Sequence, residues 1–502
     1  MCIFCRSANE SSLNISRRGL LKGVAGLGAL GAMSYFSNSS AALAQTASLP
    51  RQTGAEGVRY LIRGGSVLSM DAAVGDHDVA DVLIEGKKIL AIAPHIDAGD
   101  AAVIDAAGRV VMPGFIDTHH HQFETALRSF LSNGLLADNG QENGSVNYMD
   151  YILGRFAKVY RPEDVYISEL FGSLSQLDAG VTTVHDVSQI HHSPAHTDAA
   201  IRGISESGRR AAFGYFEGQG KDMRHPEDVR RIKDEYFGSK DQLMTLVMGG
   251  EVYLPNFERA WQLGRELDLP IAAHVVGGAI NLPFEQMAGE GKLGPDNLFF
   301  HMTGQDDAAW RIAADTGVGL SFAVPIEMTM RHGTPPLIKA VSMGMKPSLS
   351  TDVECTMSAD FFTQMRSAMT LQRALVNQAA IDGKNDLPAL LTDRDVIEFA
   401  TVNGAKALWL DDKVGTLTPG KEADIVLLDG TALNVAPINS VPGAVVTLMD
   451  RTNVETVIVA GKIRKWQGQL LDADIDGLRT KLVASRDYLF ETANIEQDLF
   501  HK

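Results

Sequence analysis

The middle of the chain, from about Pro113 to Leu408, alternates short apolar segments typical of buried strands with amphipathic segments typical of helices. The helical segments, such as NFERAWQLGRELD, carry apolar residues three and four positions apart. The candidate strands are VVMPGFID, GVTTVHDV from Gly180, RRAAFGYFEG from Arg209, LMTLVMGGEVY from Leu243, PIAAHVV from Pro270, NLFFHMT from Asn297, GVGLSFAV from Gly317 and KPSLSTDV from Lys346. Near-continuous apolar strands between helices favour a parallel sheet, and this number of units favours closure. We therefore predict an α/β fold with a TIM-type (β/α)8 barrel over residues 113–413.

Two further segments, residues 58–112 and 414–470, have a different pattern of short strands separated by glycine-containing turns. Because they flank the barrel in sequence, we expect them to pair into one small composite β-sandwich domain. Residues 471–502 are predicted to form a C-terminal helical tail.

The N-terminal residues resemble an export signal. Ser16-Arg17-Arg18-Gly19-Leu20-Leu21-Lys22 fits the twin-arginine pattern, a Gly/Ala-rich run follows, and Ala42-Leu43-Ala44 offers small residues for cleavage. The run is short and glycine-rich for a spanning helix. We expect residues 1–44 to be a twin-arginine signal peptide, and the mature protein to be periplasmic or secreted without a stable membrane anchor.

The net charge restricts which partners the chain can bind, and the cysteine content restricts how the fold can be stabilised. The 502 residues carry a formal net charge of −17, which would repel nucleic acid and anionic lipid. A small-molecule substrate is the expected partner, and a homo-oligomer stays open. Cys2 and Cys5 lie in the segment expected to be removed, so Cys355 is left without a partner for an internal disulfide.

A metal-binding pattern stands at the end of the first strand, in Pro113-Gly114-Phe115-Ile116-Asp117-Thr118-His119-His120-His121. Side chains two apart on a strand point the same way, so His119 and His121 can converge on one metal ion. His274, His301 and Asp352 each end a later strand. Barrel active sites lie at the C-terminal ends of the strands, so these side chains are expected to meet.

This motif resembles the first-strand signature of the amidohydrolase superfamily. GVTTV and ATVNGAKALWLDDKVGTLTPGKEADIVLLD are also similar to that superfamily, in the branch of cytosine deaminase-like, S-adenosylhomocysteine deaminase-like and triazine chlorohydrolase-like enzymes. The resemblance implies one divalent metal ion held by His119, His121, His274 and Asp352. Zinc is the expected ion, and iron or manganese would also suit these ligands.

In such a site the ion lowers the pKa of bound water, and each remaining residue has a predicted role. Asp352 takes the proton of the water and later passes it to the leaving group. His301 orients the substrate or stabilises the negative charge that develops on it.

The sequence departs from the deaminase pattern at Gly277, where those enzymes carry a proton-shuttling glutamate three residues after the fifth-strand histidine. Glu251, at the end of the fourth strand, is the candidate replacement. It could serve as a substitute acid, bridge a second metal ion, cap a helix or pair with an arginine.

We therefore expect a hydrolase that cleaves a non-peptide carbon–nitrogen bond in a small cyclic or heterocyclic substrate. Hydrolytic dehalogenation and opening of a lactone are alternatives on the same site, and a non-catalytic metal-binding scaffold is the alternative from another class. Weaker candidates for the pocket are His185, His191, His192, His196 and His332, with loop positions as the simpler account. Glu124 and Arg128 could contact substrate or form an ion pair at four-residue spacing.

Overall fold

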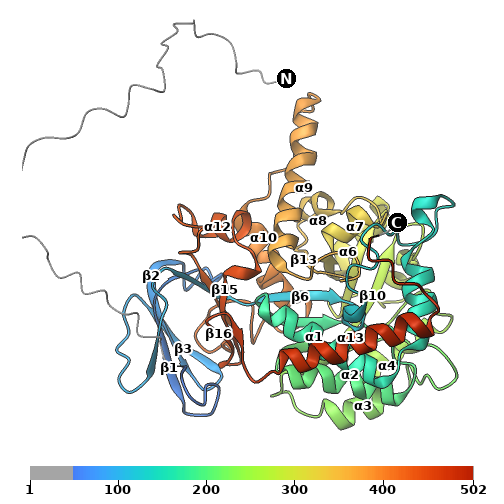
Figure 1. The fold of residues 1–502 in the computed structure, drawn as a ribbon. Coiled ribbons are helices and arrows are strands. Elements are labelled where there is room, and N and C mark those ends of the chain that lie inside the picture. Colours follow the sequence, from blue (N-terminus) through green and yellow to red (C-terminus); the bar gives the residue numbers. More distant parts are fainter. Residues whose placement is uncertain (1–48, 501–502) are drawn as a thin grey trace, which may run out of the picture. The chain divides into compact units, whose positions relative to one another are not determined.

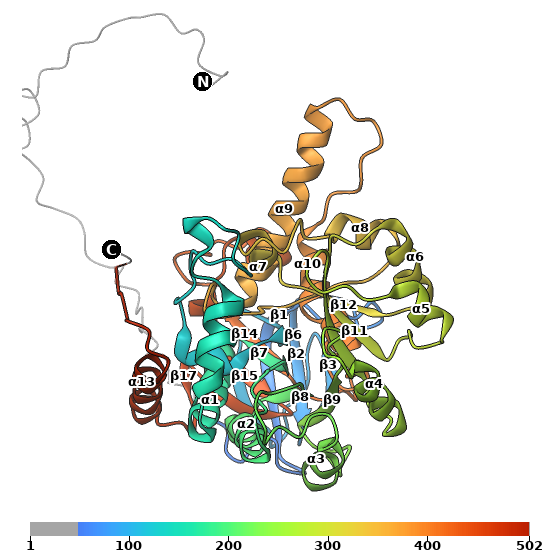
Figure 2. The same cartoon turned by 90° about the vertical axis from the view of Figure 1, so that its right-hand side faces the viewer.

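The computed structural model describes residues 49–500, and the predicted signal peptide lies outside them. Eight parallel strands follow one another in chain order around a barrel (Figures 1 and 2). They are β6 (Phe115–His120), β7 (Val181–Asp186), β8 (Arg210–Tyr215), β9 (Met244–Gly249), β10 (Ile271–Val276), β11 (Asn297–Thr303), β12 (Gly319–Phe322) and β13 (Ser348–Leu349). A barrel strand lies within each of the eight predicted segments, so the predicted barrel is confirmed.

The first and last strands meet at the level of the candidate ligands. The backbone N–H of His121 donates to the carbonyl of Asp352 at 2.8 Å, and the N–H of Asp352 donates to the carbonyl of His119 at 2.9 Å. Thr118 Oγ1 also lies 2.9 Å from Ser348 Oγ. The backbone contact that brings the sheet round on itself therefore fixes three of the predicted ligands relative to one another.

Helices cover the outside of the barrel. They include α1 (Pro162–Asp178), α2 (Pro194–Ser207), α3 (Val229–Tyr236), α4 (Phe257–Glu266), α5 (Phe284–Gly289), α6 (Asp307–Thr316), α7 (Val324–Thr329), α8 (Leu337–Ser342), α10 (Asp393–Ala400) and α11 (Val402–Ala407). The strands are buried on both faces, because helices pack outside them and side chains fill the interior. This burial explains why the strand sequences are almost continuously apolar.

The segment VVMPGFID is two strands rather than the single strand expected. β5 (Arg109–Pro113) pairs antiparallel with β14 (Ile425–Asp429), whereas β6 begins at Phe115 and pairs with β7. Gly114 makes the change of sheet, and a Cβ on it would lie 2.2 Å from Thr182 Cγ2. Pro113-Gly114 is the only sign of this break in the sequence, because both strands beside it are buried and apolar.

The strands from the two ends of the chain form one mixed sheet in the order β17-β16-β15-β14-β5-β1-β2-β3, with β4 beside β1. Their bounds are β1 (Arg59–Val67), β2 (His77–Glu85), β3 (Lys88–Ala93), β4 (Ala102–Asp105), β15 (Val454–Val459), β16 (Lys462–Trp466) and β17 (Gln469–Leu470). Pairing of β5 with β14 joins the N-terminal and C-terminal segments. The folding of this sheet into a two-layered sandwich stays a prediction.

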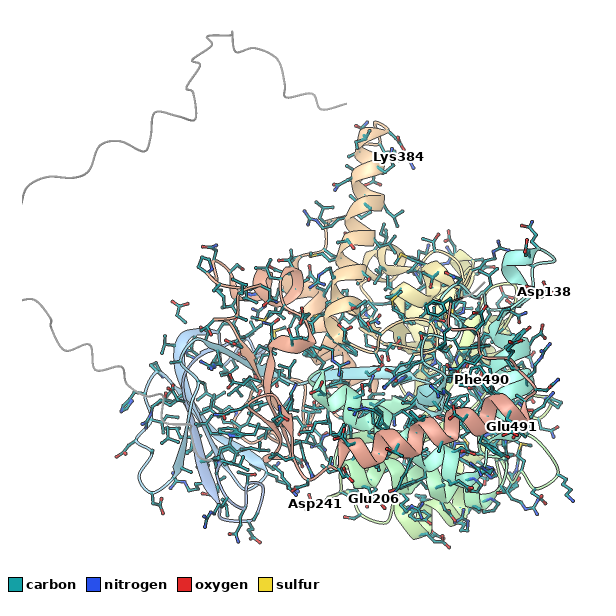
Figure 3. The ribbon with its side chains drawn as sticks, viewed as in Figure 1. Asp138, Glu206, Asp241, Lys384, Phe490 and Glu491 are labelled. Atoms are coloured by element: carbon teal, nitrogen blue, oxygen red, sulfur yellow. The ribbon has the colours of Figure 1, made fainter. Side chains whose placement is uncertain are left out.

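Three further helices, in the C-terminal third of the chain, are not part of the mixed sheet. Between β14 and β15 the chain leaves the sheet, and α12 (Val441–Thr447) contacts α10 and α9 (Phe361–Ile381). The outer end of α9 projects beyond the barrel, with Lys384 at its tip (Figures 1 and 3). α13 (Ile475–Thr492) lies along α1, where Ser485 Oγ donates to Asp164 at 2.7 Å. No helix in the described part of the chain is both long enough and apolar enough to span a bilayer.

Candidate metal centre

The predicted ligands meet at the C-terminal ends of the barrel strands. His119 Nε2 lies 3.0 Å from His121 Nε2 and 3.1 Å from His274 Nε2. Asp352 Oδ1 is 3.3 Å from His121 Nε2 and 3.6 Å from His119 Nε2. Donor atoms from strands β6 and β10 and from the residues after β13 therefore surround one point, as the spacing in sequence indicated.

These four residues suit a small divalent ion. A tetrahedral ion with bonds of about 2.0–2.1 Å would hold its ligand atoms roughly 3.3–3.4 Å apart, which is close to the separations found. Burial lowers the pKa of His274 to about 3, so its imidazole is neutral, as metal binding requires. Three imidazoles and one carboxylate are also the donor set that zinc, iron and manganese accept.

Glu251 lies behind His274, and both of its carboxylate oxygens contact that residue. Oε1 is 2.6 Å from His274 Nδ1, and Oε2 accepts from the His274 backbone N–H at 3.2 Å. A carboxylate that accepts at Nδ1 leaves the lone pair of Nε2 directed at the centre. Glu251 is absent from the lining of the cavity and from the candidate ligand groups of the described residues. This placement favours a positioning role over the substitute acid, the second-metal bridge, the helix cap and the arginine pair considered above.

A second glutamate, Glu327, contacts His301 in the way that Glu251 contacts His274. His301 Nδ1 lies 3.1 Å from Oε1 of buried Glu327, and its Nε2 faces Asp352 Oδ2 at 3.6 Å. Burial lowers the pKa of His301 to about 4. His301 and Asp352 adopt left-handed backbone conformations, with φ of 68° and 61°, which non-glycine residues rarely hold. Such strain is typical of residues that the surrounding structure fixes for function.

A cavity of about 570 Å³ opens directly over this centre. His121, His274, His301 and Asp352 line its inner part. Much of its wall is apolar, and it includes Leu136, Met149, Leu153, Leu254, Val276, Ile280, Met330 and Val353. The polar groups of the wall are few, and they include Gln189, Glu217, Gln219, Tyr253 and His332. An apolar cavity with a few convergent polar groups is the usual form of a small-molecule site.

Sequence reasoning did not find Glu217 or Glu327. Glu217 follows β8 just as Glu251 follows β9, so the rule that barrel chemistry lies after the strands could have found it. Glu327 lies within α7, where no such rule applies. Only the fold brings Glu327 to His301.

Of the five histidines considered as weaker candidates for the pocket, one lines the cavity and four do not. His332 lines the cavity, with its ring 4.7 Å from that of His301. The other four do not line the cavity and have contacts within the scaffold, with His185 Nδ1 at 3.1 Å from the Thr118 carbonyl and His192 Nε2 at 2.7 Å from the Ala157 carbonyl. His191 Nδ1 lies 3.2 Å from Thr197 Oγ1, and His196 Nε2 lies 3.0 Å from the Tyr160 carbonyl.

Glu124 and Arg128 do not form the ion pair that was one of their two alternatives, and neither of them lines the cavity above the metal ligands. Arg128 donates instead to Glu354, at 3.0 and 2.8 Å. Glu124 is fully buried, and burial raises the pKa of its carboxyl to about 7. The segment Gln122–Leu127 is a 3-10 helix, which ends before Arg128, so the four-residue spacing does not bring the two side chains together.

Known proteins with similar sequences include deaminases. The chain is 27% identical over 424 residues to a 5'-deoxyadenosine deaminase of Methanosarcina mazei, covering 80% of this chain and 92% of the relative. It is 25% identical over 436 residues to a 5-methylthioadenosine/S-adenosylhomocysteine deaminase of Pelotomaculum thermopropionicum, covering 82% and 95% of the two chains.

Solved structures show the same fold. A zinc-bound adenosine deaminase from Xanthomonas campestris superposes with a TM-score of 0.74 at 22% identity, covering 87% of this chain and all of the other. Atrazine chlorohydrolase from Arthrobacter aurescens, in complex with zinc, gives 0.72 at 19% identity, covering 85% and 100%.

The family comparison agrees with the ligand cluster. Residues 110–464, which span the barrel and part of the mixed sheet, match the Amidohydrolase family. Together with the His/His/Asp cluster, this match supports a divalent metal and confirms the expected metallohydrolase of carbon–nitrogen bonds. The chain belongs to the amidohydrolase family.

Proposed function

We propose that this protein hydrolyses a carbon–nitrogen bond of a small, neutral heterocycle, with one zinc ion held by His119, His121, His274 and Asp352. The observation that carries the proposal is that His119 Nε2 lies 3.0 Å from His121 Nε2 and 3.1 Å from His274 Nε2, with Asp352 Oδ1 3.3 Å from His121 Nε2, beneath a cavity of about 570 Å³. A divalent ion bound there would lower the pKa of water from about 16 toward about 7 and so supply hydroxide at neutral pH.

Asp352 and His301 supply the proton transfer and the charge stabilisation that the reaction also needs. Asp352 lies between His121 and His301, and its carboxylate can accept the proton of the attacking water. Glu327 holds the His301 ring so that Nε2 faces the same space. Burial raises the pKa of Glu327 to about 8, so its acid form can donate to His301 Nδ1 and leave a hydrogen on Nε2. His301 can then donate that hydrogen to the group on which negative charge develops.

The cavity wall favours an uncharged substrate. Among the described residues that line it there is no lysine or arginine to bind a carboxylate or phosphate. Leucine, methionine and valine side chains would contact an apolar ring or its alkyl substituents instead. The names of the deaminase relatives support carbon–nitrogen cleavage over halide removal or lactone opening, and the complete ligand set favours an enzyme over a scaffold.

Export through the twin-arginine pathway, and hence a periplasmic or secreted location, is part of the same proposal. The motif Ser16-Arg17-Arg18 supports it. Replacing both arginines with lysine should keep the protein in the cytoplasm in its uncleaved form. Unchanged export and cleavage of that double variant would reject this pathway.

Metal analysis and a substrate screen on one purified sample test the function. The protein should contain about one zinc per chain and release ammonia or an amine from some member of a panel of amino-substituted heterocycles. Asp352→Asn should remove turnover while the fold is kept, and Glu206→Gln on the surface of α2 is the control (Figure 3). Zinc-loaded protein that hydrolyses the panel without releasing ammonia or amine would reject carbon–nitrogen cleavage.

A further inference from the structure

Cleavage of a carbon–nitrogen bond requires two proton transfers. From the sequence alone both are assigned to Asp352, whereas the cavity holds a second acid that can supply the proton to nitrogen. The attacking water loses a proton, and the departing nitrogen must gain one because an amide anion is a very poor leaving group. Apart from Asp352, Glu217 is the only carboxylic acid among the described residues that line the cavity. The second proton therefore has an obvious candidate source.

The position three residues after His274 cannot supply this acid. Gly277 donates its N–H to the Thr303 carbonyl at 2.7 Å, so the ends of β10 and β11 are in close contact there. A Cβ on Gly277 would lie 2.7 Å from the carbonyl oxygen of Gly304 and 2.8 Å from its Cα. Side chains do not approach backbone that closely, so a glutamate at this position would require the two strand ends to separate.

Glu217 has the geometry of a group that faces a ligand. Its side chain is 8% exposed, and its Oε1 accepts a hydrogen bond from the hydroxyl of Tyr253. Its Oε2 is buried and has no partner within the described part of the chain. A buried carboxyl oxygen without a partner is costly in a folded protein, which points to a ligand that completes it. Both Glu217 and Tyr253 line the cavity above the metal ligands.

We propose that Glu217 is the general acid that protonates the leaving nitrogen, which deepens the proposed function and rests on it. As water attacks, a new carbon–oxygen bond forms and the water proton passes to Asp352. The carbon–nitrogen bond then breaks, its electron pair stays on nitrogen, and the carboxylic acid of Glu217 gives that nitrogen its proton. Solvent reprotonates Glu217 and accepts the proton of Asp352, so one water is consumed for each bond cleaved.

The surroundings of Glu217 suit this role. Burial, with a smaller contribution from the Glu251 carboxylate, raises the pKa of Glu217 to about 7, so much of it holds a proton at neutral pH. The bond from Tyr253 opposes this shift and fixes one oxygen, leaving the other for substrate. The simpler alternative is that Glu217 only anchors Tyr253, which is 45% exposed at the cavity mouth.

A series of leaving groups separates the two roles. One heterocycle that the enzyme accepts is prepared with alkylamine, aniline and electron-poor aniline leaving groups at the same carbon. Glu217→Gln keeps the size of the side chain and an oxygen for Tyr253. For a general acid, the variant should lose about 100- to 10,000-fold in kcat with the alkylamine and far less with the electron-poor aniline, which departs with little help. Addition of formate should partly rescue Glu217→Ala with the alkylamine.

Matched variants serve as controls. Tyr166 donates to Glu206 at 2.5 Å on the exterior of α1 and α2, so Glu206→Gln alters a similar tyrosine–carboxyl pair away from the cavity and should leave kcat unchanged. Tyr253→Phe should raise KM more than it lowers kcat. His332→Asn should leave the dependence on leaving group as in the natural protein.

An equal loss by Glu217→Gln across the whole series would overturn the proposal, as would a steeper dependence in His332→Asn alone. If Glu217→Gln does not fold, Glu217→Asp, which keeps an acid at a shorter reach, should retain the shallow dependence and a lower kcat. A natural enzyme that cleaves no member of the series would contradict the proposed function itself, before any variant is compared.

Discussion

Glu251 Oε1 lies 2.6 Å from Nδ1 of His274, and the opposite nitrogen of that imidazole, Nε2, lies 3.1 Å from Nε2 of His119. The carboxylate therefore controls the metal centre through one histidine without reaching it. The same relationship joins Glu327 to His301 at 3.1 Å. Two carboxyl groups that sequence alone cannot connect to their histidines thus set the orientation of two imidazole rings.

Replacing the carboxyl group of Glu251 should weaken metal binding more than it alters the fold. In Glu251→Gln the amide holds the Nδ1 proton less strongly, and we expect zinc affinity to fall about 10- to 100-fold. Competition against a chelator measures this. Glu217→Gln, which alters another buried glutamate that is not bonded to a metal ligand, should bind zinc as the natural protein does. Equal affinity in both variants would show that Glu251 does not position His274.

Removal of the metal should lower stability in a way that depends on the ligands. An ion that binds only the folded chain stabilises it by about 2.7 kcal/mol at a hundredfold excess over Kd, so zinc should raise Tm by a few degrees. His119→Ala removes a fully buried ligand and should abolish this increase. His95→Ala, at an exposed position near the mixed sheet, should keep it. A zinc-induced rise in Tm that persists in His119→Ala would place the ion elsewhere.

The pattern of strands in the sequence located the metal ligands, because ligands in a barrel lie where its strands end. Residues at the C-terminal ends of parallel barrel strands share an edge, so His119, His274 and Asp352 could be brought together without coordinates. The partners of those ligands could not, since Glu327 reaches His301 from a helix and its spacing carries no strand signal. Gly114 was missed for another reason, because two buried strands on either side of one glycine resemble a single strand.

Asp186 and Glu169 form a buried pair of acids, which should make the free energy of unfolding depend on pH. Ser188 Oγ lies 2.6 Å from Asp186 Oδ1 and 3.0 Å from Glu169 Oε1. One hydroxyl hydrogen cannot serve both bonds, so a protonated carboxyl must donate in one of them. Burial raises the pKa of Asp186 to about 7 and that of Glu169 well above its usual value.

Because these pKa values are raised on folding, the folded chain holds more protons than the unfolded chain above about pH 4. This pair therefore contributes a decrease in the free energy of unfolding as pH rises from about 4 to about 7. Buried histidines such as His274 and His301, whose pKa values are lowered to about 3 and about 4, contribute an increase over the same range. Denaturant titrations at several pH values check this. Asp186→Asn, which cannot ionise, should flatten that decrease, whereas Asp315→Asn on the exposed face of α6 should not. The same pH dependence in Asp186→Asn as in the natural protein would contradict the shared proton.

The contact between Gly277 and Gly304 predicts a cost for any side chain at residue 277. A methyl group placed 2.7 Å from the Gly304 carbonyl must push β10 and β11 apart, so Gly277→Ala should lower the free energy of unfolding by about 1–3 kcal/mol. Zinc affinity should fall as well, because His274 lies on the displaced strand. Gly289→Ala is the matched control, since its added Cβ meets no atom within 4 Å at the end of α5, and it should be neutral or slightly stabilising. If Gly277→Ala were as stable as Gly289→Ala, the strand ends would have room for a side chain, and the steric reason for placing the second acid on β8 would be lost.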